Sequence, residues 1–308
     1  MNLSRKEADM SRRPALSLLE VIIAIAIVGI LTAMLLSGVQ KAREASIRLQ
    51  CSNKLRQIII ATHSYSTDHD GRLASFSQVR WGSNNALELS PFEAILPYID
   101  QGSYYRALVE QGAQTGVRNM RIAAYICPSD PSLDGAYHGR VPDVCSYPAN
   151  AQLFWHGASI NRSIPDGLSQ TIAFAEHYSQ CDYAVFIYHL NEFFFSPNVR
   201  RATFADGGGE GEHWPLSDVY PINDGNSTHP SISGRTFQVR PDVHGNLSES
   251  FKLPRGINTC DPTMLQTGHT SLVIAMADGS VRTIHPGVSE TAFWSAITPN
   301  GGEVANLD

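Results

Sequence analysis

The chain has 308 residues, enough for one or two domains of ordinary size. Its 23 basic and 29 acidic residues give a formal net charge of −6, which argues against nucleic acid as a partner. Only 17% of the residues are charged, and there are 24 glycines and 17 prolines among many short apolar runs, so we expect a loop-rich β domain.

A long apolar segment follows a short leader at the N-terminus. Residues 21–39 contain no charged residue and no proline, and about 20 apolar residues are enough for a helix to cross a bilayer. The run exceeds the roughly 7–15 apolar residues of a secretory signal peptide, and a helical pattern follows it. We therefore expect a transmembrane helix over residues 16–39. A plain signal anchor explains everything except Glu20, because a carboxylate within the apolar zone is costly and needs a partner.

The leader and Glu20 resemble the start of a type IV pilin or pseudopilin precursor. That family has a short basic leader, a peptidase cleavage site and a glutamate at the fifth mature position. Arg12 and Arg13 match the basic leader, and counting back from Glu20 places the cleavage between Ala15 and Leu16, after a leader of residues 1–15. Ala15 stands where the family usually has glycine, and Leu16 where it usually has phenylalanine. The resemblance implies a methylated amine on Leu16 that pairs with Glu20 of a neighbouring copy.

The charges around the apolar segment do not decide its orientation. Four basic residues precede it, and Lys41, Arg43 and Arg48 follow it closely, so the positive-inside rule alone gives no answer. The resemblance implies a single-pass protein of the bacterial inner membrane, with a cytoplasmic N-terminus and a globular domain in the periplasm or outside the cell.

The helical pattern continues beyond the apolar segment. Apolar residues in 40–70 recur mostly at spacings of three or four, which predicts an amphipathic helix that forms a spine for the globular domain. This stripe consists of Ala42, Ala45, Leu49, Leu55, Ile58, Ile59, Thr62 and Tyr65. We expect Asp70 and Gly71 to end a helix of about 50 residues, roughly 80 Å long. Two helices with a break near Gly38 are the alternative.

Residues 71–308 form the predicted extracytoplasmic domain. A short helical insertion is expected over 90–112. The strands expected after it lie at 123–127, 171–175, 184–196 and 234–246, the last as an edge strand. The strongest β signal is Asp278-Gly279 between two apolar runs, which predicts a final hairpin. With the helix first and the strands after it, the predicted fold class is α+β: a long N-terminal helix packed on an antiparallel sheet, pilin-like and loop-rich.

The chain as a whole resembles a large bacterial prepilin-like family, domain of unknown function 1559. Its C-terminal signature is a histidine, nine residues and then Asp-Gly; here His269 is followed by eight residues before Asp278 and Gly279. Other matching pieces lie at residues 40–58, 95–101, 126–130, 146–150 and 164–176. The resemblance implies export, membrane anchoring and pseudopilin-like assembly, with a prepilin peptidase and other pilin-like subunits as partners. It implies no established activity.

The five cysteines are Cys51, Cys127, Cys145, Cys181 and Cys260. None forms a CxxC pair, so zinc-ribbon and thioredoxin-like sites have no support. In an oxidising compartment some can pair, and the odd number leaves at least one unpaired within the chain. The sequence does not fix the connectivity. Cys51 and Cys127 match positions of the family, so we expect them to lie near each other as a possible disulfide.

The sequence contains no strong catalytic or metal-binding motif. Its 11 histidines form no HExxH or HxH, and GxSxG is absent, so we expect no catalytic residue, no metal ligand and no cofactor. Glu176 and His177 are adjacent and would face opposite sides of a strand. We expect His269 and Asp278 to meet across the final hairpin in a structural hydrogen bond. A structural calcium at Asp166, Asp278 or residues 206–212 is a minor alternative.

Two functions from different classes remain open. The first is a non-enzymatic pseudopilin-like structural subunit, assembled through its N-terminal helix in a type II secretion or type IV pilus-like system. The second is a membrane-anchored binding module, for a glycan or another surface ligand, that uses the prepilin leader for export. Aromatic side chains that line a groove would favour binding, whereas packing on the spine would favour assembly. The relevant residues are Tyr98, Tyr104, Tyr105, Trp155 and Trp214.

Overall fold

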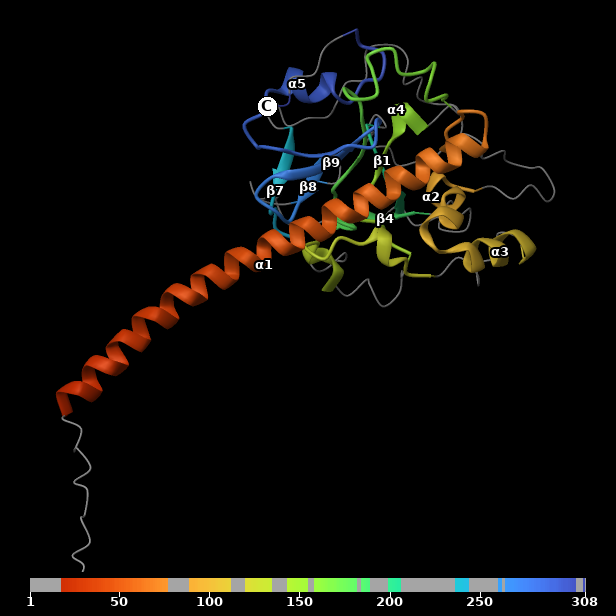
Figure 1. The fold of residues 1–308 in the computed structure, drawn as a ribbon. Helices are drawn as coiled ribbons and strands as arrows, with labels where there is room; N and C mark the ends of the chain where they lie inside the picture. The colour runs from red at the N-terminus through yellow and green to blue at the C-terminus, as the bar shows by residue number, and fades with distance from the viewer. Residues whose placement is uncertain are drawn as a thin grey trace, which may run out of the picture. The chain divides into compact units, whose positions relative to one another are not determined.

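The computed structural model describes the chain from residue 18 onward, in separate stretches. The described residues are 18–76, 89–111, 120–134, 143–154, 158–181, 184–188, 199–205, 236–243, 260–261, 264–302 and 307. The chain divides into two compact units, Met1–Ser46 and Ile47–Asp308. The sheets and the short helices drawn in Figure 1 all belong to the second unit.

The first element, α1 (Leu18–Asp68), is one helix of 51 residues. The alternative of two helices with a break near Gly38 is therefore wrong, as no proline interrupts the backbone hydrogen bonds. The helix ends where the sequence predicts. Asp70 and Gly71 have φ angles of 54° and 79°, and the Gly71 N–H donates to the Ser66 carbonyl over 2.8 Å. A left-handed residue that returns a hydrogen bond to the last turn is a common way to end a helix.

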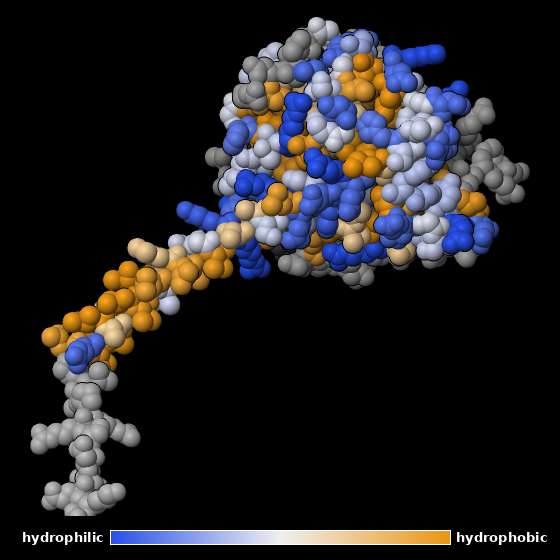
Figure 2. All heavy atoms as spheres, viewed as in Figure 1, coloured by the Kyte–Doolittle hydropathy of each residue, from blue (hydrophilic) through white to orange (hydrophobic). Residues whose placement is uncertain are grey.

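The two parts of α1 differ in burial. Residues 18–43 are all exposed, and Figure 2 shows apolar side chains covering most of this part. In the second unit one face is buried, consisting of Cys51, Leu55, Ile58, Ile59, Ala61, Thr62 and Ser66. The predicted stripe is thus confirmed from Leu55 onward but wrong at Ala42, which is exposed, and at Leu49, which is 64% exposed. Leu49 precedes Cys51 by two positions, roughly 200° around the helix, so the two side chains face opposite directions.

Short helices follow α1, as expected for the segment after residue 90. They are α2 (Pro91–Ala94), η2 (Leu96–Ile99) and α3 (Gly102–Gln111). A capping box starts α2: the Glu93 N–H donates to Ser90 Oγ over 3.1 Å, and the Ser90 N–H donates to the Glu93 carboxylate over 2.9 Å.

The strand predicted at 123–127 is wrong. This segment forms the 3-10 turn η3 (Ala123–Tyr125), and η4 (Pro131–Asp134) follows it. The Tyr125 side chain is fully buried; its hydroxyl donates to the Phe92 carbonyl over 2.6 Å, and its ring packs edge-on against the Phe92 ring. Anchoring this ring in the core outweighs the local preference of aromatic and β-branched residues for a strand.

The main sheet has five strands in the order β10-β9-β2-β1-β6. Its members are β1 (Ala149–Asn150), β2 (Ile172–Ala175), β6 (Thr203–Phe204), β9 (Leu272–Met276) and β10 (Val281–Ile284). Neighbours are antiparallel except β1 and β6, which are parallel. The α+β class is therefore confirmed, with one parallel pair at the edge of an otherwise antiparallel sheet.

The predicted final hairpin is confirmed as β9 and β10. Gly279 adopts a φ of 91°, a conformation that a side chain rarely allows. The Ser280 N–H donates to Asp278 Oδ1 over 2.8 Å, and the Met276 N–H donates to the Ser280 carbonyl over the same distance. The aspartate side chain and the glycine backbone thus build the turn together.

Smaller elements complete the second unit. One sheet joins β3 (Gln180–Cys181), β4 (Ala184–Ile187) and β5 (Val199–Arg201), and another pairs β7 (Phe237–Val239) with β8 (Leu265–Thr267). The remaining helices are α4 (Ala151–Phe154) and α5 (Glu290–Ser295).

The main sheet separates two apolar cores. Along β9, Val273 and Ala275 belong to the core that includes the buried face of α1. The alternate residues of β9 (Leu272, Ile274 and Met276) belong to a second core with Phe293 of α5. Because successive side chains of a strand point to opposite faces, β9 is apolar throughout and buried on both sides. The spine of α1 is therefore fixed on one face of the sheet.

Candidate functional site

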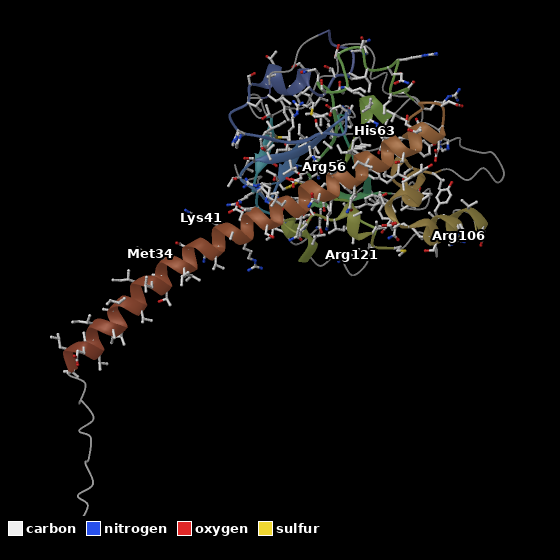
Figure 3. All side chains as sticks on the ribbon, in the orientation of Figure 1. Met34, Lys41, Arg56, His63, Arg106 and Arg121 are labelled. Carbon is white, nitrogen blue, oxygen red and sulfur yellow. A yellow bond between two sulfur atoms is a disulfide. The ribbon has the colours of Figure 1, made fainter. Side chains whose placement is uncertain are left out.

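The exposed part of α1 is the first candidate. An 18-residue window of this helix has a mean hydropathy of 2.7, and none of the window is buried. The helix is therefore long and apolar enough to cross a membrane. Met34 and Lys41, labelled in Figure 3, lie on this part of α1, with Lys41 just beyond the apolar run. Glu20 lies in the first turn and is exposed, whereas Ala15 and Leu16 lie outside the described residues.

A disulfide attaches a loop to the spine of the second unit. Cys51 of α1 and Cys127 are joined, with their Cα atoms 5.4 Å apart, within the usual range for such bonds. Beside this bond, the Lys54 ammonium donates to the Ile126 carbonyl over 2.6 Å. A covalent bond and a charged hydrogen bond thus fix the loop that follows η3.

The other cysteines have separate roles. Cys181 and Cys260 form a second disulfide, a pairing that the sequence left open. Cys145 is the free cysteine among the described residues, and it is fully buried. Burial raises the pKa of the Cys145 thiol, which keeps it protonated and unreactive.

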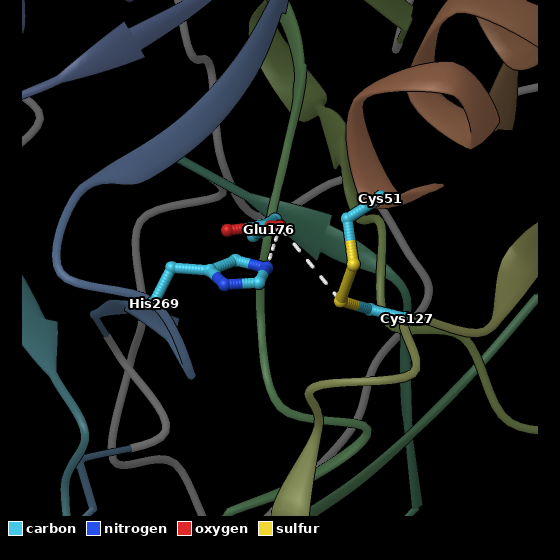
Figure 4. Close-up of side chains that lie close together, drawn as sticks. All are labelled: Cys51, Cys127, Glu176 and His269. Carbon is cyan, nitrogen blue, oxygen red and sulfur yellow. Dashed lines mark hydrogen bonds and ion pairs between the residues drawn. A yellow bond between two sulfur atoms is a disulfide. The ribbon is translucent and has the colours of Figure 1, made fainter. Parts of the chain in front are cut away.

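A buried polar cluster surrounds the Cys51–Cys127 disulfide (Figure 4). Glu176 Oε1 lies 3.7 Å from Cys127 Sγ and 3.5 Å from His269 Nε2. The Ser129 hydroxyl lies 3.0 Å from His269 Nε2 and 3.1 Å from Cys127 Sγ. The two cysteines, Glu176 and His269 are each at most 3% exposed. The cluster therefore joins a disulfide, a carboxyl group and an imidazole away from water.

The Glu176 carboxyl group is held in one orientation. Its Oε2 accepts hydrogen bonds from the Thr267 hydroxyl over 2.7 Å and the Val273 N–H over 3.2 Å, which leaves Oε1 facing the cluster. Burial raises the pKa of Glu176 to about 8, and these two hydrogen bonds reduce the effect of burial. The carboxyl group is therefore largely protonated at neutral pH.

Close backbone packing positions His269. A Cβ atom on Gly268 would lie 2.1 Å from the Ser129 carbonyl oxygen, so only glycine fits there. The His269 N–H also donates to Thr267 Oγ1 over 3.0 Å. The segment before β9 is thus pressed against the loop that carries Cys127 and Ser129.

Comparison with protein families identifies the chain. A family model described as "Protein of unknown function (DUF1559)" matches residues 40–288, which is more than half of the chain. The chain belongs to the DUF1559 family. The match begins near the end of the apolar segment and covers most of the second unit, so the resemblance to this family is confirmed. No curated protein and no solved structure shows significant similarity to the chain.

One contact predicted within the C-terminal motif of this DUF1559 protein does not form. His269 and Asp278 do not bond to each other: His269 is buried beside Ser129 and Glu176, whereas Asp278 is exposed and accepts from Ser280. The reason is the length of β9, which places the two residues at opposite ends of a strand of five residues. Gly279 serves the turn of the hairpin.

Other residues singled out in the sequence have structural partners. His177 Nδ1 lies 2.5 Å from the Tyr178 carbonyl oxygen, and the His177 ring packs on Phe186. The Asp166 carboxylate accepts from the Gly301 and Gly302 N–H groups over 2.7 and 2.9 Å. This arrangement gives Asp166 a role in fixing the C-terminal segment, and residues 206–212 lie outside the described chain.

The tyrosines proposed as a binding surface pack against the protein. The Tyr98 hydroxyl donates to Asp68 of α1 over 2.6 Å, and its ring meets Tyr65 edge-on. Tyr104 is buried, with its hydroxyl 3.3 Å from that of Tyr188. Tyr105 is partly buried against the larger core, while Trp155 and Trp214 lie outside the described residues.

The contact between Glu176 and His269 was missed by sequence reasoning. The two residues are far apart in the sequence, and they meet because β2 pairs with β9. One signal was present: the pieces that resemble the DUF1559 family include Cys51, Cys127 and Ser129 as well as Glu176, and His269 begins the C-terminal motif. Taken together, these pieces mark a single buried cluster.

A buried aspartate away from this cluster predicts how stability depends on pH. Burial raises the pKa of Asp143 from 3.8 to about 6. The Tyr188 phenol next to it stays neutral in this range, because burial raises its pKa as well. Because the pKa of Asp143 is higher in the folded state than in the unfolded state, ionisation of this group favours unfolding. The full free energy of unfolding is therefore present below the unfolded pKa near 4, and part of it is lost as the pH rises through about 6. Asp143→Asn should therefore stabilise the protein at pH 7 by about 2–3 kcal/mol.

Thermal unfolding of the full chain in detergent micelles at pH 4 and pH 7 measures this effect. The variant and the wild type should have similar stability at pH 4, and the variant should be the more stable at pH 7. Parallel loss of stability in both proteins between these pH values would show that Asp143 does not titrate as described.

Proposed function

We propose that this DUF1559 protein is a membrane-anchored, pilin-like structural subunit. A prepilin peptidase removes its leader, and the mature protein assembles with other subunits through its N-terminal helix, without catalytic activity. The observation that carries this proposal is the exposed N-terminal part of α1, with a window of mean hydropathy 2.7 and no residue of that window buried. A helix that is apolar on all sides is stable in lipid or against other apolar helices.

Glu20 supports assembly beyond simple anchoring. It lies in the first turn of α1, directly before the uncharged residues 21–39. A cut between Ala15 and Leu16 would create an amine close to this carboxylate in sequence, and an amine from a neighbouring copy would compensate its charge in the membrane. Two copies would thereby be aligned in one register.

The proposed topology places the N-terminus in the cytoplasm and the second unit beyond the inner membrane. Two disulfides in that unit, Cys51–Cys127 and Cys181–Cys260, support this location, because such bonds persist in oxidising compartments. The packing of Tyr98 and Tyr104 on the second unit's own residues favours assembly over the binding of a glycan.

Mass spectrometry of the protein extracted from membranes of its native host tests the processing step. The mature chain should begin at Leu16 with a methylated amine and should lack residues 1–15. Ala15→Gly, which restores the residue usual in prepilins, should be cut at least as completely. An intact leader on the mature protein, or a cut after Ser37 or Gly38 with release from the membrane, would contradict the proposal.

A further inference from the structure

Four buried groups that can bind a metal ion converge in the second unit. They are the sulfur atoms of Cys51 and Cys127, a carboxylate oxygen of Glu176 and a ring nitrogen of His269, all within 4.8 Å of one another. They come from α1, from the loop before η4, from the end of β2 and from the segment before β9. Thiolate, imidazole and carboxylate are the ligands that zinc takes in proteins.

We propose that this cluster is a redox-controlled zinc site. When the Cys51–Cys127 disulfide is reduced, the two thiolates bind one Zn²⁺ together with His269 Nε2 and Glu176 Oε1. When the disulfide forms, two of the four ligands are lost and the metal is released. The proposed site lies entirely in the second unit, so it does not depend on how the N-terminal helix is processed or assembled.

Two of the ligand–ligand distances in the oxidised protein already suit a tetrahedral site. Zinc–ligand bonds of about 2.0–2.3 Å place the ligand atoms about 3.3–3.8 Å from one another. His269 Nε2 lies 3.5 Å from Glu176 Oε1, and Cys127 Sγ lies 3.7 Å from the same oxygen. The two bonded sulfurs must separate to about 3.8 Å, which opening of the disulfide permits.

Neighbouring groups orient the proposed ligands. Thr267 and Val273 hold Glu176 Oε2, so that Oε1 is presented to the metal position. The Ser129 hydroxyl, now 3.1 Å from Cys127 Sγ, can donate to a metal-bound thiolate. The charges of Asp130 and Arg48 act on Glu176 in opposite directions, the aspartate disfavouring its charged form and the arginine favouring it. Such outer partners fix the ligands and strengthen metal binding.

The redox step requires a dithiol reductant. One of its thiolates attacks a sulfur of the disulfide, breaks the S–S bond and forms a mixed disulfide with the protein. Its second thiol resolves that bond, so the reductant leaves as a disulfide, and two electrons and two protons remain on Cys51 and Cys127. Zn²⁺ then displaces both thiol protons, which pass to solvent, and Glu176 binds as its carboxylate.

Metal titration of the full chain in detergent micelles tests the proposal. The protein is reduced, the reductant is removed without oxygen, and Zn²⁺ is added; bound zinc is counted by elemental analysis, and Co²⁺ in its place reports tetrahedral thiolate coordination by its absorption. Reduced wild type should bind one Zn²⁺ per chain, and oxidised wild type none. Glu176→Gln and His269→Gln should each weaken binding more than about tenfold, since loss of even an outer partner costs 10–100-fold.

Two double variants provide the controls. Cys181→Ser with Cys260→Ser removes the other pair of thiols and should leave the site intact. Cys51→Ser with Cys127→Ser should abolish binding. If reduced wild type binds no more zinc than this second variant, the pair is a structural disulfide only. Binding that is unchanged in Glu176→Gln and His269→Gln would also overturn the proposal, as would a Co²⁺ spectrum without thiolate bands.

Discussion

Replacing Cys51 and Cys127 together with alanine is expected to lower the free energy of unfolding by about 4 kcal/mol. The bond joins residues 76 positions apart, so it removes much conformational freedom from the unfolded chain. It also connects the spine of α1 to the loop at Ile126, where the Lys54 hydrogen bond alone would remain. For a domain of this size, the melting temperature should fall by about 10 °C.

Thermal unfolding of the full oxidised chain in detergent micelles measures this effect. Two variants serve as matched controls. Cys145→Ala removes a buried sulfur that forms no disulfide, and it should cost about 1 kcal/mol. Cys181→Ala with Cys260→Ala opens a loop of nearly equal length, 79 positions, and should cost about as much as the first pair. A loss for Cys51 and Cys127 no larger than that for Cys145→Ala would refute the stabilising role.

Local patterns were sufficient for the elements whose contacts are local. The end of α1 at Asp70 and Gly71, and the hairpin around Asp278 and Gly279, depend on backbone conformations that particular residues favour. The buried face of the spine follows from helical spacing from Leu55 onward. These predictions hold because neighbours in sequence supply the deciding interactions.

Contacts between distant segments decided the rest. Tyr125 forms a 3-10 turn rather than a strand because its ring and hydroxyl are fixed against Phe92. Glu176 meets His269 because β2 pairs with β9, with the Glu176 N–H donating to the Val273 carbonyl over 3.0 Å. Neither arrangement has a signature in spacing or composition. The Cys51–Cys127 pairing was indicated by family resemblance, since cysteine positions alone allow several connectivities.

Replacing Glu20 with alanine is expected to reduce assembly about tenfold or more while membrane insertion and folding remain intact. A charged carboxylate in the apolar zone costs about 3 kcal/mol, and a fixed amine on a neighbouring copy offsets that cost only when subunits pack together. If packing of the subunits offsets half of this cost, the association constant between subunits changes about tenfold. Glu20→Leu should behave like Glu20→Ala, because the charge matters and the volume does not.

Glu44→Gln provides the matched control for these variants. Glu44 lies on the same helix, beyond the uncharged residues 21–39, so it should not affect pairing within the membrane. Membrane fractionation and removal of residues 1–15 should be the same in all four proteins. A defect in insertion or cleavage in the Glu20 variants would mean that the acid acts before assembly.

The most direct test is the yield of crosslinks between neighbouring copies in native membranes. A photoreactive residue replaces Ile30, which is 59% exposed on the apolar part of α1. The pilin-like account predicts crosslinked dimers and higher species for the otherwise wild-type protein and for Glu44→Gln, and about a tenfold lower yield for Glu20→Ala and Glu20→Leu. Equal yields in all four proteins, or no crosslinks in the wild-type background, would contradict assembly through Glu20 and leave α1 as a simple membrane anchor.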